Sequence, residues 1–212
     1  MGKQWGEQLA GWGRSLADWG LRLWQRRPAW VLSTGGLVII IPVGVIFVLS
    51  LVWGIPPDRF DPQETARAFA VEHDQVDVED ELPEGYITAA TLERMLRYLL
   101  DKPGGYLYND IAPPGVLMDN IPSFEKGVVI QCRDFAEALR DDMTRAQTQS
   151  REDPDLAIVD PQLNFNFNKW GILLIPSTED EYRKAQSALR SYLKRLANRD
   201  TPGDGQFYVR AD

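Results

Sequence analysis

The chain has 212 residues, with one cysteine, one histidine and a formal net charge of −8. Residues 1–28 carry five basic and two acidic side chains, whereas residues 56–212 carry 18 basic and 29 acidic ones. Nucleic-acid binding needs clustered positive charge, so an acidic body excludes a nucleic-acid partner, and one cysteine excludes an intrachain disulfide.

Residues 1–28 form a basic head in which Trp, Gly and Leu recur every seven residues, three times each. On a helix the repeated Trp and Leu side chains share one face and the charges lie opposite. A short coiled coil is one interpretation, and a helix in the membrane interface is the other. Bulky Trp rings suit a tight coiled-coil seam poorly, so the interfacial helix is favoured over the coiled coil and over a simple anchor-strengthening arm. Its apolar face is Trp5, Leu9, Trp12, Leu16, Trp19 and Leu23.

Residues 29–55 contain no ionisable side chain. About 20 apolar residues suffice to cross a bilayer, so the segment predicts one transmembrane helix, with the lipid bilayer as a partner. We expect Trp30 and Trp53 at the two interfaces and a kink at Pro42. The run exceeds the apolar region of a usual signal peptide and lacks its small-residue cleavage site, which favours an uncleaved anchor.

The flanking charges predict how the chain is oriented. Cytoplasmic flanks of membrane spans are enriched in Lys and Arg, so the basic head should lie in the cytoplasm. The acidic body then lies across the membrane. We therefore expect a single-pass inner-membrane protein with its N-terminus in the cytoplasm and its body in the periplasm.

The body is predicted to be mainly α-helical, with at most a minor β-hairpin or extended segment. Residues 56–87 should hold a first helix, capped by Asp61 and ending near His73, and then an acidic connector. Residues 88–212 should form the helical body. Its helices are expected to begin at Thr88, at Ser123 and after a capping box of Thr178 and Glu181. The alternating residues 163–168 with the apolar run from 170 predict a hairpin or an extended segment.

The stretch 103–125 mixes turn-forming and large apolar residues, so it predicts an ordered loop pinned by its apolar side chains: Tyr106, Leu107, Tyr108, Val116, Leu117 and Met118. Its polar side chains are expected to cap helices or to line a recognition surface. The candidate interaction surface comprises this loop and the polar end of the helix that follows: Tyr106, Asn109, Asp110, Asp119, Asn120, Glu125, Arg145 and Gln147.

Several short strings in combination resemble the bacterial domain-of-unknown-function family 2333. They are Pro103-Gly-Gly-Tyr, Asn109-Asp110, Pro113-Pro114-Gly115, Asp119-Asn120, Arg133-Asp134, and Trp170 followed by Pro176-Ser-Thr-Glu. The resemblance implies a membrane-anchored envelope protein of Gram-negative bacteria and carries over no catalytic residue. It also implies that the natural reading frame continues beyond Asp212.

No cofactor or metal is predicted, because the sequence lacks a Ser/His/Asp set, His-rich metal spacing and a nucleotide-binding loop. The favoured function is a non-catalytic binding or scaffold protein with a protein partner in the envelope. One alternative is a periplasmic hydrolase using carboxylates, with Asp110, Asp119 and Glu125 as the first residues to consider. The other alternative is an accessory subunit of a larger membrane complex.

Overall fold

The structure is a computed structural model of the chain, and it describes residues 29–74, 76–77, 81–144, 152–171, 175–198 and 205–208, with side chains from residue 34 onward. The predicted interfacial head, the side chain of Trp30, and Arg145 and Gln147 lie outside the described residues. The chain divides into two compact units, Met1–Val48 and Leu49–Asp212.

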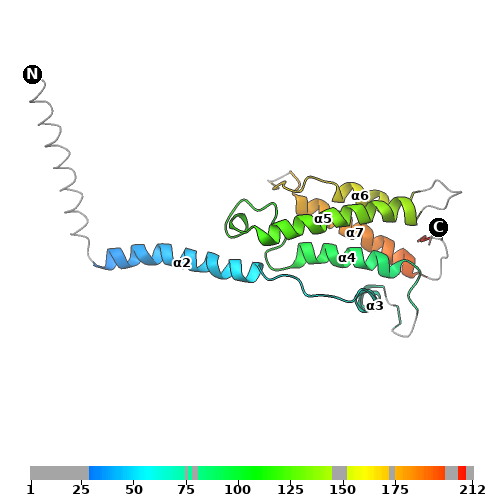
Figure 1. Cartoon of the computed structure of the whole chain (residues 1–212), viewed down its shortest axis with the longest axis horizontal. Coiled ribbons are helices and arrows are strands. Elements are labelled where there is room, and N and C mark those ends of the chain that lie inside the picture. Colours follow the sequence, from blue (N-terminus) through cyan, green and yellow to red (C-terminus); the bar gives the residue numbers. More distant parts are fainter. Residues whose placement is uncertain are drawn as a thin grey trace, which may run out of the picture. The chain divides into compact units, whose positions relative to one another are not determined.

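Helix α2 (Ala29–Trp53) is the apolar helix near the N-terminus (Figure 1). Its stretch Thr34–Trp53 has a mean hydropathy of 2.8, and its large apolar side chains, such as Val38 and Ile40, are exposed rather than packed in a core. Pro42 lies inside the helix. Such a helix is a candidate membrane span, and a signal sequence has the same composition.

The second unit consists of the helices α3 (Pro62–His73), α4 (Tyr86–Asp101), α5 (Asn120–Ala138), α6 (Leu156–Leu163) and α7 (Thr178–Ala197). A 3-10 turn, η1 (Gly115–Leu117), precedes α5, and a π-helical turn, η2 (Leu139–Met143), extends it. In Figure 1, α4, α5 and α7 run alongside one another and α3 is seen end-on next to α4. The described residues contain no strand, so the predicted, mainly helical fold class is confirmed.

Local sequence signals set the first and last helices. The carboxylate of Asp61 accepts hydrogen bonds from the backbone N–H groups of Gln63 and Glu64, as predicted for an N-cap. The capping box of α7 was predicted one residue too late. It consists of Ser177 and Asp180, whose side chains each bond the other residue's backbone N–H.

Two predicted helix starts are wrong. Helix α4 begins at Tyr86 rather than at Thr88, because Gly85 adopts a φ of +80° and turns the chain into the helix. Helix α5 begins at Asn120, three residues before Ser123. Helix α6 was not predicted, although three of its apolar side chains, Leu156, Val159 and Leu163, are completely buried.

The core is built from leucines, alanines and four buried tyrosines: Tyr86, Tyr106, Tyr182 and Tyr192. Tyr106 and Tyr182 pack edge-to-face with ring centroids 5.5 Å apart. Cys132 is buried, and burial raises the pKa of its thiol to about 12, which leaves it unreactive. The apolar stripe of α7 is buried in the core, with residues such as Leu189 and Leu193.

The basic face of α7 is not simply exposed to solvent. Arg190 donates to the completely buried carboxylate of Glu93 on α4, with Nη2 and Oε1 2.7 Å apart. Arg195 pairs with Asp153 and Asp155, which lie just before α6. These ion pairs tie α7 to its neighbours, and their partners are too distant in the sequence for a helical pattern to reveal them.

Candidate functional site

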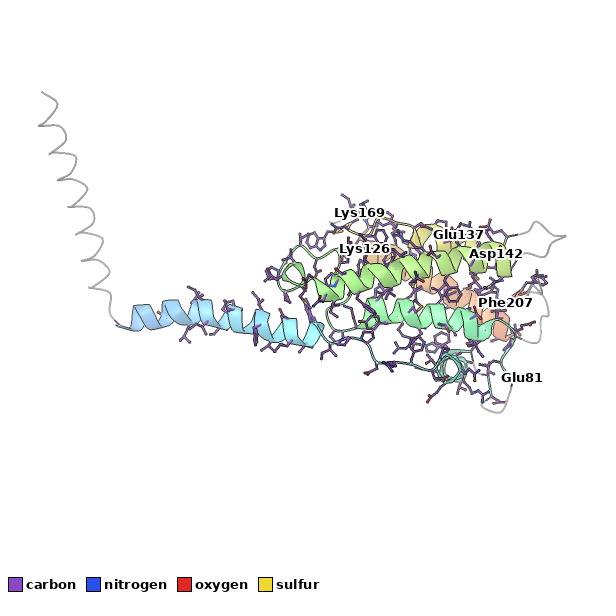
Figure 2. The ribbon with its side chains drawn as sticks, viewed as in Figure 1. Glu81, Lys126, Glu137, Asp142, Lys169 and Phe207 are labelled. Carbon is purple, nitrogen blue, oxygen red and sulfur yellow. The ribbon has the colours of Figure 1, made fainter. Side chains whose placement is uncertain are left out.

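The loop between α4 and α5 and the segment that leads into α7 lie at the same end of the helical unit (Figure 1). Figure 2 places Lys126 and Lys169 toward this end, and Glu81 and Phe207 toward the other. Two hydrogen bonds join the loop directly to this segment and to the first turn of α7. Asn109 Nδ2 donates to the carbonyl oxygen of Lys169 at 3.2 Å, and the Tyr106 N–H donates to Glu179 Oε1 at 2.8 Å.

The carboxylate of Glu125 fixes the loop through several polar contacts. Its Oε2 accepts hydrogen bonds from the backbone N–H groups of Leu107 at 2.8 Å and Tyr108 at 2.9 Å. Its Oε1 lies 2.6 Å from Lys102 Nζ, and Lys102 also donates to the carbonyl oxygen of Gly105. Glu125 is completely buried, and this burial raises the pKa of its carboxyl despite these partners. Its carboxylate therefore positions the loop and does not face solvent.

The loop turns sharply just before its polar residues. Gly104 and Gly105 have φ values of +89° and +67°, which residues with a side chain rarely adopt. Tyr106 follows them and buries its ring in the core, which attaches this part of the loop to the helical bundle. The turn thereby presents Asn109 and Asp110 toward the N-terminus of α7.

A pocket of about 410 Å³ lies between these segments. It is lined by Gly104, Asn109, Asp110, Trp170, Gly171, Ile175, Ser177, Glu179 and Asp180. Three of the lining side chains are carboxylates, and two, Trp170 and Ile175, are exposed apolar residues. Within the described ranges, no group of three His, Cys, Asp or Glu side chains is placed to hold a metal ion.

The carboxylates of the pocket differ in their surroundings. Partial burial and the neighbouring charge of Glu179 raise the pKa of the Asp110 carboxyl, and Lys102 opposes this only in part. Hydrogen bonds from the backbone N–H and the hydroxyl of Ser177 lower the pKa of Asp180. The carboxylate of Asp110 accepts no hydrogen bond from the described residues. It therefore has unused acceptor capacity at the pocket wall.

The six described residues of the predicted interaction surface do not lie on one surface. Asn109 and Asp110 line the pocket, whereas the side chains of Tyr106 and Glu125 are buried. Asp119 and Asn120 are exposed at the start of α5. Asp119 occupies the N-cap position but its side chain makes no capping hydrogen bond, so the capping role expected of it is wrong. Of the predicted loop pins, Val116 and Leu117 are wrong, because both are mostly exposed.

Trp170, Glu179 and Asp180 were not singled out from the sequence as site residues. One signal was available: Trp170 is the only tryptophan after residue 55. Tryptophan is enriched in the cores of protein interfaces relative to the rest of the surface. The two acids lie in the first turn of α7, a position that favours negative charge in any helix, so their presence alone does not indicate a site.

Replacing Asp110 with asparagine is expected to raise the thermal midpoint at neutral pH, because the change removes a partly desolvated charge that repels Glu179. Because the pKa of Asp110 is raised in the folded state, its ionised carboxylate destabilises the fold at any pH above that pKa. This destabilisation disappears as the pH falls through the raised pKa to the usual value of 3.8. The gain in midpoint should therefore shrink between about pH 7 and about pH 4 when followed by circular dichroism.

The matched control is Asp119→Asn, which removes an exposed carboxylate from the same loop without touching the pocket. It should leave the midpoint unchanged at both pH values. A midpoint for Asp110→Asn that is lower than that of the unmodified chain at neutral pH would contradict the view that the charge of Asp110 destabilises the fold.

No curated protein and no solved structure matches the chain. The family described as an uncharacterized protein conserved in bacteria (DUF2333) matches residues 24–212, which include α2, the helical unit and every residue of the pocket. The chain therefore belongs to the DUF2333 family, as the resemblance of its loop and capping motifs predicted.

Proposed function

We propose that the chain is a single-pass inner-membrane protein whose body binds a protein partner in the envelope without catalysing a reaction. The observation that carries the proposal is the exposed apolar surface of α2, which includes residues such as Leu37, Ile41 and Phe47. Exposing so large an apolar surface to water is unfavourable in free energy, whereas placing it in a bilayer core is favourable. The helix therefore serves as an anchor for the helical unit.

The charge distribution supports the orientation of this anchor. The head before α2 is basic and the body after it is acidic. Short basic flanks stay on the cytoplasmic side, so the body is exported to the periplasm. The same acidic balance suits binding to a basic surface rather than to nucleic acid.

A binding role is supported by how the carboxylates are used. Glu125, one of the three acids expected first in a hydrolase, is completely buried and bonded to two backbone N–H groups and a lysine. Asp119 lies outside the pocket. Only Asp110 of these three acids faces the pocket, so they do not form the carboxylate pair that glycoside hydrolysis requires.

One observation favours a hydrolase as the second candidate. Asp110 has a raised carboxyl pKa and lines the pocket with Glu179, and a raised pKa beside an ionised partner is the pattern of a general acid. The test is release of reducing ends from purified cell-wall glycan. Release that is lost in Asp110→Asn would support the hydrolase and contradict the non-catalytic proposal.

The anchoring proposal is tested by washing isolated membranes with alkaline carbonate and measuring the intact mass of the retained protein by mass spectrometry. The proposal predicts that the whole 24.1 kDa chain stays with the membrane. Retention of a shorter product that lacks α2, or release of the chain into the wash, would overturn it. Purification in mild detergent then tests the partner: recovery of the chain alone would count against a stable partner.

A further inference from the structure

The pocket between the α4–α5 loop and the start of α7 offers hydrogen-bond acceptors that nothing in the described part of the chain uses. Asn109 is only 4% exposed, and its Nδ2 donates to the Lys169 carbonyl oxygen. This bond fixes the amide orientation, since an amide oxygen placed there would face another acceptor. Its Oδ1 accepts no hydrogen bond from the described residues. Asn109 lines the pocket, so a ligand donor there can bond this oxygen.

Two carboxylates of the pocket also have unused oxygens. The Asp110 carboxylate accepts no hydrogen bond from the described residues, and Glu179 uses Oε1 alone, for the N–H of Tyr106. Both residues line the pocket together with Asp180. A ligand that fits must therefore bring several donors to the site.

The nearby lysines do not neutralise this charge fully. Lys102 is paired with Glu125 at 2.6 Å, and it lowers the pKa of Asp110 less than burial and Glu179 raise it. Lys169 places its ammonium group 5.1 Å from the centroid of the Phe165 ring. An incoming positive charge would relieve the repulsion between Asp110 and Glu179.

The aromatic lining selects the shape of this cation. Trp170 is 49% exposed and lines the pocket beside the carboxylates. A guanidinium group is planar, so it can stack on an indole ring while its N–H groups bond a carboxylate in pairs. The chain contains a related arrangement with a phenyl ring and backbone acceptors: the guanidinium of Arg133 lies 3.5 Å from the centroid of the Phe167 ring and donates to the carbonyl oxygens of Leu163 and Phe165.

We propose that the pocket lined by Asn109, Asp110, Trp170 and Glu179 binds a guanidinium group, the side chain of an arginine presented by a protein partner. The proposal rests on the proposed binding function and adds the chemistry by which the partner is recognised. The guanidinium stacks on Trp170 and donates to Asp110, to the free oxygen of Glu179 and to Asn109 Oδ1.

The test uses the full chain in detergent micelles, labelled with 5-fluorotryptophan. The chain has seven tryptophans, and Trp170→Phe identifies the fluorine signal of Trp170 as the one that disappears. The probe is acetyl-arginine amide, and its matched control is acetyl-citrulline amide, which has the same shape without the charge. We expect arginine to shift the Trp170 signal saturably and citrulline to leave it in place.

Variants of the pocket sharpen the test. Asp110→Asn and Glu179→Gln keep the size of each side chain and should each weaken arginine binding about tenfold, because each removes a charge-assisted hydrogen bond. Asp119→Asn should leave the affinity unchanged. Equal shifts with citrulline, tighter binding of acetyl-lysine amide, or undiminished arginine binding by Asp110→Asn would each overturn the proposal.

Failure of this proposal is distinguishable from failure of the anchoring proposal. The carbonate wash contains no arginine probe, and the titration in micelles does not depend on orientation in the cell. A chain that is retained in membranes but ignores arginine refutes the guanidinium site alone.

Discussion

Glu125→Ala is expected to lower the free energy of unfolding by about 3–5 kcal/mol, the cost of removing one partner of a buried ion pair. Lys102, whose side chain is 6% exposed, would keep its charge without a partner, and the N–H groups of Leu107 and Tyr108 would lose their acceptor. Natural domains are stable by about 5–15 kcal/mol, so the loss would be a large share of the total. Urea denaturation of the full chain in detergent, followed by circular dichroism, measures it.

Two variants make this prediction specific. Asp119→Asn removes an exposed acid from the same loop and should change the free energy of unfolding by less than about 0.5 kcal/mol. Lys102→Met combined with Glu125→Gln removes both charges, and its cost should be smaller than the sum of the two single changes. A loss below about 1 kcal/mol for Glu125→Ala would contradict the positioning role of this residue.

Placing two arginines in the middle of α2, Ile41→Arg with Val45→Arg, is expected to abolish stable membrane insertion. Both native side chains are apolar and exposed, at 58% and 52%. Each arginine at the centre of a span costs about 2.5–3.5 kcal/mol on insertion scales. The double variant should therefore appear in the soluble or degraded fraction after a carbonate wash.

The control for the span is Ile41→Leu with Val45→Leu, which keeps the surface apolar and should be retained like the unmodified chain. Retention of the double arginine variant in the carbonate-washed membrane would show that α2 is not the segment that holds the protein there. The assay thus separates the helix itself from the basic head as the source of membrane binding.

The sequence predicted those parts of the fold that depend on short-range signals. The start of α3 follows from Asp61 and Pro62, and the apolar stripe of α7 follows from its period. The start of α4 was misplaced because a glycine with positive φ replaced the expected threonine cap. Helix α6 was missed because it is only eight residues long and contains Pro161.

The site was only partly predictable, because it joins segments that are far apart in the sequence. Asn109 and Asp110 were named from the loop, but Glu179, about 70 residues later, reaches them through a fold that no local pattern encodes. Glu125 was interpreted as a surface acid, since its helical position alone does not reveal that two backbone N–H groups and a lysine converge on it. Charge pairs such as Glu93 with Arg190 were missed for the same reason.

The most direct measurement of the central claim is the location of the body relative to the membrane. Two fusions after Asp212 report it. Alkaline phosphatase is active only in the periplasm. Green fluorescent protein fluoresces in the cytoplasm but not after it is exported unfolded across the inner membrane. We predict phosphatase activity and no fluorescence. Fluorescence without phosphatase activity would place the body in the cytoplasm and contradict the proposed anchor orientation and envelope role.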